Sequence, residues 1–308
     1  MSTVAEGVDE EHVASTWRGA AKDAGVLAET YESACAFVYV NSRADMNPCV
    51  TRAPLWNGGV NTLVVDYTDH ARTDRPAIAG SMAMEAASNT HTCYYRSGFD
   101  MSVPLYPREA YLELEPIPPE ERKFFLTVKG SVYLSGTGSE ERMSVVPLQD
   151  EANGVIASMH CFELHHEHLL QDNVEYCEAL KARYDDHDYG ELMNSTFSLV
   201  PSGRSPGTYR LGEVMSAGTI PVFVGRDLVR PFDEDFDWDK FSFVFTPDEV
   251  GPGLIETLRA VPPETLKEMQ RESLQAYWKM FEGTTNSFEV IARRIVDELV
   301  RRIKSPQR

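Results

Sequence analysis

Long apolar runs are absent from this chain, and no stretch approaches the ~18–20 residues that a membrane-spanning helix needs. The first 15 residues are acidic and polar and lack the pattern of a signal peptide. We therefore expect no membrane anchor and no signal peptide in this chain. The five cysteines include no CxxC pair, which argues against a thiolate zinc site. The nicotinamide fingerprint GxGxxG and internal repeats are also missing, so a sugar-phosphate isomerase or another Rossmann enzyme is only a minor alternative.

Positive charge is scarce, because 29 Lys and Arg stand against 48 Asp and Glu and give a net charge of −19. Binding to nucleic acid or to anionic lipid is therefore not expected. A polyanionic partner would also be repelled unless a local basic groove exists. The length of 308 residues favours two domains, and 42% hydrophobic residues are typical of chains with real cores.

The most informative stretch runs over residues 197–232 and predicts a strand, a polar loop, a helix and a second strand. Residues 201–207 contain two glycines and two prolines and form the loop. Thr208 is the expected N-cap of the helix, and Gly218 stands where a C′ glycine belongs. A loop of this kind, at the carboxyl end of a parallel strand, favours an anion such as a phosphate.

Two arginines strengthen the phosphate interpretation. Arg204 lies in the loop and Arg210 in the helix, and both carry forked donors that suit phosphate oxygens. Glu213 lies three residues after Arg210 on a neighbouring part of the same face, where it could accept hydrogen bonds from ribose hydroxyls. The alternative is an ordinary βαβ unit whose arginines are solvated or paired with Glu213.

Four segments resemble the exostosin family of glycosyltransferases. They are LVPSGRSPGTYRLGEVMSAGTIPVFV at 199–224, PLWNGG at 54–59, YRSGFDMSVPL at 95–105 and the strand and turn at 125–130. They occur in family order from about residue 30 to residue 300. The resemblance implies an α/β protein of the GT-B type with two Rossmann-like lobes and parallel sheets, in which the N-terminal lobe is shortened.

The expected organisation is a disordered leader at 1–15, an N-terminal acceptor-side lobe at 16–120 and a C-terminal nucleotide-sugar-binding lobe with C-terminal helices at 121–308. A proline-rich connector at 114–121 marks the boundary. Periodicity and composition predict helices at 16–32, 77–88, 254–260, 263–281 and 288–303 and strands at 34–40, 62–67, 101–105, 124–129 and 155–160. The apolar face of the last helix could pack on either lobe.

The resemblance implies an inverting transferase that moves a sugar from a nucleoside-diphosphate sugar, a UDP-sugar by expectation, to a glycan acceptor. It assigns donor binding to Arg142, Arg204, Ser205, Gly207, Thr208 and Arg210, and it assigns the ribose to Glu213. It implies no tightly bound cofactor and no metal. The histidines and glutamates at 160–168 could bind a metal, but no predicted helix or strand holds them together, so a solvated loop is the preferred interpretation.

The acceptor side is assigned to Asn57, Asn61 and Arg96, and Asp100 is the candidate base. Asp100 could instead cap a turn or pair with Arg96. Asp66, Asp69 and His70 are other candidates for a base, although a solvated loop is the simpler interpretation.

Several departures from the family pattern favour a second hypothesis. The family carries Arg and His where this chain has Val60, Asn61 and Thr62, and a basic pair where it has Ser131 and Val132. These losses favour a catalytically degenerate scaffold that stabilises an active partner, as a homodimer or with another exostosin-like chain.

The resemblance also implies a Golgi location and a disulfide between Cys161 and Cys177 in a lumenal setting. The alternative is that all five cysteines stay reduced, as expected in the cytosol. Asn194 begins an N-glycosylation sequon, Asn-Ser-Thr, which is weak support for a secretory route.

Overall fold

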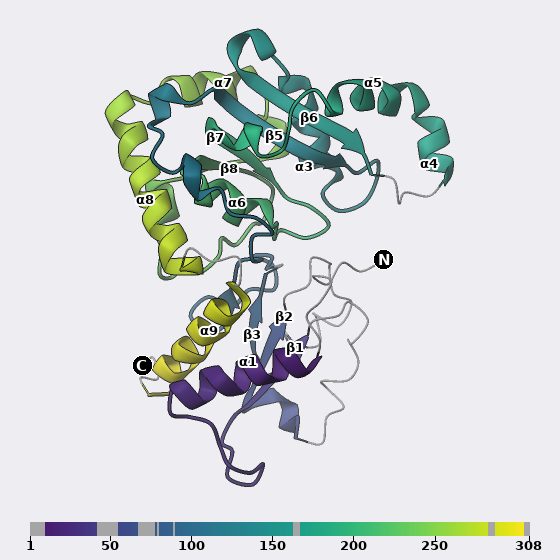
Figure 1. The fold of residues 1–308 in the computed structure, drawn as a ribbon. Helices are drawn as coiled ribbons and strands as arrows, with labels where there is room; N and C mark the ends of the chain where they lie inside the picture. The colour runs from purple at the N-terminus through teal and green to yellow at the C-terminus, as the bar shows by residue number, and fades with distance from the viewer. Residues whose placement is uncertain are drawn as a thin grey trace.

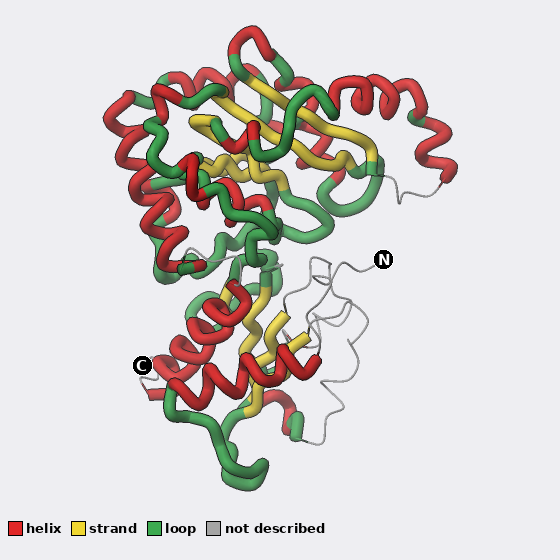
Figure 2. Tube along the Cα trace, viewed as in Figure 1, coloured by secondary structure: helices red, strands yellow, loops and turns green. Residues whose placement is uncertain are grey.

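The computed structural model describes residues 10–41, 55–66, 78, 80–88, 90–162, 167–282 and 287–304. These residues form two α/β lobes, each built around a parallel sheet of its own (Figure 1). Figure 2 shows the strands of the second lobe lying among helices. The expected fold class, two lobes with parallel sheets, is confirmed. None of the described helices is long and apolar enough to cross a membrane.

The first lobe is organised by a sheet of order β1-β2-β3-β4 in which every described pairing is parallel. Its strands are β1 (Phe37–Asn41), β2 (Thr62–Asp66), β3 (Met84–Ala87) and β4 (Met101–Ser102). All five residues of β2 are buried, as expected for a parallel strand that is covered on both faces.

Two helices from opposite ends of the chain cover this lobe: α1 (Glu10–Asp23) and α9 (Ser287–Lys304). They lie side by side in Figure 1, and Val13 and Trp17 of α1 share one buried cluster with Ile291 and Ile295 of α9. The spacing of three and four residues between these apolar side chains places them on one face of each helix. The last helix therefore packs on the first lobe, which the sequence left open.

Two predictions in the first lobe are wrong. The leader does not extend to residue 15, because α1 already begins at Glu10 and buries Val13. The helix predicted over 77–88 is strand β3 at Met84–Ala87. Alanine and methionine favour helices, but here three of the four side chains of β3 are buried between neighbouring strands, and tertiary packing overrides the local propensity.

The second lobe has a five-stranded parallel sheet of order β6-β5-β7-β8-β9. Its strands are β5 (Phe124–Val132), β6 (Val155–Cys161), β7 (Ser195–Pro201), β8 (Ile220–Val224) and β9 (Phe243–Phe245). The chain moves from β5 to one side, into β6, and then crosses back to build β7, β8 and β9 on the other side. Loops after β5 and β7 therefore diverge at the carboxyl edge, where open α/β sheets bind their ligands.

The helices of the second lobe are α3 (Ser139–Ser144), α4 (Glu167–Asp172), α5 (Val174–Tyr184), α6 (Arg210–Ser216), α7 (Pro252–Arg259) and α8 (Pro263–Phe281). Short 3-10 turns are η2 (Asn57–Gly59), η3 (Leu112–Leu114), η4 (Pro119–Glu121), η5 (Val146–Leu148), η6 (Glu151–Asn153), η7 (Glu191–Met193), η8 (Trp238–Lys240) and η9 (Pro247–Glu249). The turns η3 and η4 lie in the connector between the lobes, so the boundary expected after residue 120 falls just before β5.

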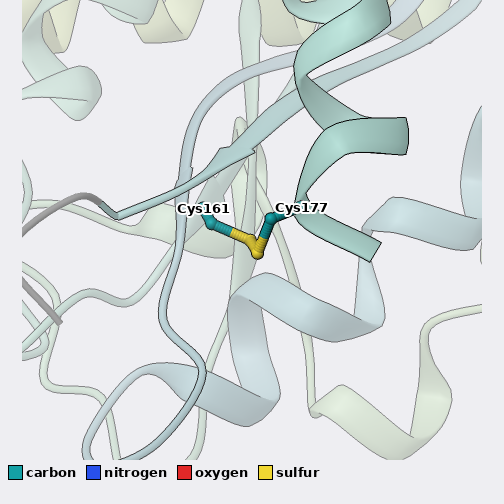
Figure 3. Close-up of a disulfide and its surroundings, with 2 residues drawn as sticks. All are labelled: Cys161 and Cys177. Carbon is teal, nitrogen blue, oxygen red and sulfur yellow. A yellow bond between two sulfur atoms is a disulfide. The ribbon is translucent and has the colours of Figure 1, made fainter. Parts of the chain in front are cut away.

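A disulfide joins Cys161, at the end of β6, to Cys177 in α5 (Figure 3). This is the pairing that the family resemblance implied. Cys35 and Cys93 are exposed free thiols.

His160 lies next to Ser131, with its Nε2 2.9 Å from the Ser131 hydroxyl. Across the described residues, no group of three or more His, Cys, Asp or Glu is arranged to hold a metal ion.

Candidate functional site

A cavity of about 720 Å³ lies over the point where the second sheet diverges. Its lining includes residues 128–131 at the end of β5 and residues 203, 204 and 207–210 after β7. These are the two loops that the strand order places at the switch point. The volume falls within the range of about 300–1,000 Å³ that is usual for small-molecule sites.

Two glycines bring the loops after β5 and β7 into contact. A Cβ atom added to Gly138 would lie 2.2 Å from the carbonyl oxygen of Gly203, and Gly138 has a φ of +82°. Only glycine fits such a close approach with this backbone conformation. Arg142 of α3 then spans both loops, because its Nη1 donates to Ser131 O (2.9 Å) and its Nε to Ser202 O (3.1 Å).

Arg210 lies at the start of α6, and its side chain reaches back to strand β7. Its Nε donates to Leu199 O (3.0 Å) and its Nη2 to the Ser198 hydroxyl (2.8 Å), so two strand-end groups fix the guanidinium. The residue is 6% exposed, and its buried Nη1 makes no hydrogen bond to any described residue. The N-cap position of α6 is Tyr209 and not the predicted Thr208, although the Thr208 hydroxyl accepts a hydrogen bond from the backbone N–H of Arg210 (3.3 Å).

Glu213 lies one turn further along α6 and is 5% exposed. Its Oε2 accepts a hydrogen bond from the Tyr189 hydroxyl, and its Oε1 accepts one from the backbone N–H of Arg108 (3.3 Å). Burial raises the pKa of Tyr189, and the Glu213 carboxylate adds to this effect, so the phenol stays protonated and continues to donate. The carboxylate is thereby held at the cavity wall in one orientation.

The opposite wall comes from residues 105–111, which follow the last strand of the first lobe. The guanidinium of Arg108 lies 4.4 Å from the centre of the Tyr209 ring. Glu109 accepts a hydrogen bond from the Tyr111 hydroxyl (2.6 Å). The sequence analysis missed these three cavity residues. The signal was available, since residues that follow a parallel strand lie at the ligand-binding edge.

Cations outnumber carboxylates at the cavity. Its lining includes four arginines and a lysine, namely Arg108, Lys129, Arg142, Arg204 and Arg210, and the carboxylates of Glu109, Asp188 and Glu213. Within the described part of the chain, no carboxylate pairs with the guanidinium of Arg108, Arg142 or Arg210. Burial lowers the pKa of Arg142, and the neighbouring Arg210 and Arg204 lower it further. Positive groups held this close destabilise one another, and an anion bound between them would reduce that repulsion.

Comparison with protein families identifies the chain. The model of the exostosin GT47 domain matches residues 26–261, which contain both sheets and the cavity. The chain belongs to the exostosin GT47 family. Exostosin-1 of Drosophila melanogaster is 30% identical over 270 residues, which cover 82% of this chain and 35% of that protein. Exostosin-1b of Danio rerio is 29% identical over 263 residues, or 80% and 34% of the two chains. The chain thus spans about a third of the length of these curated relatives.

The chain is also similar to solved structures. One is a glycosyltransferase from Rickettsia africae, with a TM-score of 0.48 and 11% identity; the match covers 96% of this chain and 83% of that one. An α,α-trehalose-phosphate synthase from Burkholderia vietnamiensis has a TM-score of 0.47 and 11% identity, and the match covers 94% and 80% of the two chains.

Most donor residues that the exostosin resemblance assigned lie together at the cavity: Arg142, Arg204, Gly207, Thr208, Arg210 and Glu213. Ser205 is an exception, because it is 2% exposed and is not part of the lining. Gly207 also forms a contact between the lobes. A Cβ atom added there would lie 2.1 Å from the carbonyl oxygen of Ser88, which follows β3.

The structure does not bring the acceptor-side residues of the exostosin assignment to the cavity. Asp100 is 3% exposed and accepts hydrogen bonds from Arg96 through both carboxylate oxygens, while its Oδ1 also accepts one from the backbone N–H of Glu85. Arg96 in turn donates to the carbonyl oxygens of Ser81 and Ala83. This pair fastens the first sheet, which is the structural role that the sequence left as the alternative. We do not carry Asp100 forward as a base.

Asn57 and Asn61 precede β2 and lie at its amino end. Since a strand rises about 3.3 Å per residue, they lie roughly 15 Å from the carboxyl end that faces the cavity. Asn194 is half-buried, and its side-chain oxygen accepts a hydrogen bond from the backbone N–H of Lys123 (3.3 Å). Asp69 and His70 lie outside the described residues.

Proposed function

We propose that the chain is a glycosyltransferase whose second lobe holds a nucleoside-diphosphate sugar, with UDP as the nucleotide. The observation that carries this proposal is that Arg210 lines the cavity while its buried Nη1 has no described hydrogen-bond partner. A nitrogen of this kind costs free energy unless an acceptor binds there. A phosphate oxygen is the acceptor that the surrounding guanidinium groups favour most.

The proposed orientation of the nucleotide sugar follows from two parts of the site, the cavity arginines and Glu213. The diphosphate lies among the cavity arginines, and the ribose hydroxyls donate to Glu213. An acceptor hydroxyl attacks the anomeric carbon on the face away from the diphosphate and loses its proton to water, so the new bond forms with inversion. The bonding electrons leave with the diphosphate, and the arginines stabilise the charge that develops on its oxygens. These fixed cations supply the charge that a metal ion would otherwise provide.

The relatives support the activity through their family, which uses nucleotide sugars. The glycan acceptor, a Golgi location and assembly with a second exostosin-like chain belong to the proposal and rest on the family resemblance alone. The four arginines also give the acidic chain a local basic surface, the condition under which an anionic acceptor is tolerated.

Calorimetric titration of UDP into the purified chain tests the donor site. We expect wild-type binding, weakened about tenfold in Glu213→Gln because a neutral amide accepts ribose hydrogen bonds less strongly than a carboxylate. Glu256→Gln is the control, since Glu256 is exposed in α7 away from the cavity. UDP-sugars that bind would then be screened for release of UDP in the presence of glycan acceptors.

A folded wild-type sample that shows no heat and no thermal shift with millimolar UDP would refute the donor site. That result would favour the scaffold hypothesis, which the positions of Asp100, Asn57 and Asn61 keep relevant. Binding of UDP without release from any UDP-sugar would retain the site but contradict the transferase activity.

A further inference from the structure

Arg108 is a cavity residue that lies outside the assigned donor residues. It comes from the segment after β4 of the first lobe, whereas Arg142, Arg204 and Arg210 belong to the second lobe. The cavity therefore has one arginine on the side of the first lobe, and three arginines and Lys129 on the other. Any anion bound between them would contact both lobes.

Three contacts fix the segment that carries Arg108. The backbone N–H of Arg108 donates to Glu213 Oε1 (3.3 Å), and that of Tyr111 donates to the Ser216 hydroxyl (2.9 Å). Pro107 packs on Gly212 of α6 so closely that a Cβ atom added to the glycine would lie 2.9 Å from the proline ring. The segment thus runs along α6 and keeps the Arg108 side chain at the cavity.

The guanidinium of Arg108 is placed to bind without being tied to a carboxylate. It lies over the Tyr209 ring, which leaves the N–H groups in its plane free to donate sideways. Two other arginines of this acidic chain pair with carboxylates, Arg226 with Asp248 (2.5 Å) and Arg230 with Asp239 (2.6 Å). No described carboxylate lies within ion-pair distance of Arg108, although Glu109 is its neighbour in sequence.

We infer that Arg108 binds the diphosphate of the nucleotide from the first-lobe side and acts as the fourth arginine of that subsite. The inference rests on the proposed function, because it names a further residue of the same site. The diphosphate is the part of the nucleotide that matches a cation, since the nucleoside is neutral. Arg108 also stacks on Tyr209, which stands between Thr208 and Arg210 of the phosphate-facing stretch.

The binding of UDP, UMP and uridine to the wild type and to Arg108→Gln separates this role from others. We expect Arg108→Gln to weaken UDP about tenfold, the size of one charge-assisted hydrogen bond. The affinity for UMP should fall much less, and the affinity for uridine should not change. Arg108→Lys, which keeps the charge but loses the fork, should recover part of the UDP affinity. Arg259→Gln is the matched control, because Arg259 is an exposed arginine that also stacks on a ring, 4.1 Å from the centre of Phe125, far from the cavity.

The outcomes discriminate between the inference and the proposed function. Equal weakening of uridine and UDP in Arg108→Gln, or an unchanged UDP affinity, would overturn the role of Arg108 and leave the donor site intact. Failure of the wild type to bind UDP would overturn both. A thermal unfolding curve for each variant establishes that a change in affinity does not reflect a loss of fold.

Discussion

Replacing Arg210 by methionine should separate ligand binding from stability. In the wild type, the two hydrogen bonds of Arg210 to Leu199 O and the Ser198 hydroxyl come from a charged donor, and each contributes about 1.5–3 kcal/mol. Its buried Nη1 without a described partner costs about 1–3 kcal/mol. The second term offsets part of the first, and methionine fills a similar space. We expect Arg210→Met to lower the free energy of unfolding by no more than about 5 kcal/mol.

Binding of UDP should weaken as well. Loss of a hydrogen bond between a charged donor and a phosphate costs about 1.5–3 kcal/mol, or roughly 10- to 150-fold in Kd. UDP at a hundred times the wild-type Kd stabilises the fold by about 2.7 kcal/mol. If the Kd of the variant rises a hundredfold, the same concentration stabilises it by only about 0.4 kcal/mol. Urea unfolding of both proteins, each with and without UDP, measures the four free energies of unfolding that this comparison needs.

Arg122→Met is the matched control. Arg122 is also buried, donates to the carbonyl oxygens of Ile117 and Gly218, and has a buried Nη1 without a described partner, but it does not line the cavity. Its stability change should be similar, and its stabilisation by UDP should equal that of the wild type. Two results would contradict the reasoning: destabilisation of Arg210→Met by more than about 6 kcal/mol, beyond what two such hydrogen bonds supply, or undiminished stabilisation by UDP.

Three further predictions concern other parts of the fold. Gly207→Ala should weaken UDP binding, because the new Cβ would lie 2.1 Å from Ser88 O and push the loop or the lobes apart; titration with UDP checks this. Reduction of the Cys161–Cys177 disulfide, which spans 16 residues, should lower the free energy of unfolding by about 3 kcal/mol, measured with and without reductant. Tyr277→Phe should be neutral or stabilising at pH 7, because the buried hydroxyl has no described partner. Burial raises the pKa of Tyr277 to about 12, so this tyrosine ionises at lower pH in the unfolded chain than in the folded protein. The free energy of unfolding of the wild type should therefore fall between about pH 10 and pH 12, and Tyr277→Phe should lack this contribution to the fall.

Each of these has a result that would count against it. For Gly207→Ala, the control is Gly253→Ala, where a new Cβ meets nothing within 4 Å, and equal affinities of the two variants would contradict the close contact. An unfolding curve that is unchanged by reductant would contradict the disulfide. For Tyr277, an identical pH profile of wild type and Tyr277→Phe would show that the phenol does not titrate differently in the folded state.

The second lobe was readable from the sequence because its signals are local. The strand Ile220–Val224 is a short β-rich run bounded by turns, and the helix Pro263–Phe281 has proline at its start and a regular apolar stripe, so both were predicted with their observed bounds. Gly218 has a φ of +68°, and the backbone N–H groups of Gly218 and Thr219 donate to Met215 O and Val214 O, which ends α6 as predicted.

The first lobe was harder because its structure depends on distant partners. Residues 10–15 have the composition of a solvated leader, and the packing of Val13 against α9, which lies nearly 280 residues later in the sequence, extends the helix to Glu10. Strand β3 has alanine and methionine where a helix would use them, and its pairing with β2 and β4 decides otherwise. For Asp100, the sequence left open a base or a partner of Arg96, and the structure shows Arg96 donating to both of its carboxylate oxygens.

The arrangement of the cavity links donor binding to the docking of the lobes. Gly207 touches Ser88 across the lobe boundary, and Glu213 holds the backbone of Arg108, so the same two segments that face the ligand also join the lobes. A ligand that contacts both Arg108 and Arg210 would bind most tightly when the two lobes are in contact, and it would stabilise that contact by its higher affinity for it. Substitutions at the lobe contact and at the arginines should therefore be non-additive in UDP affinity, whereas either one combined with Arg259→Gln should be additive.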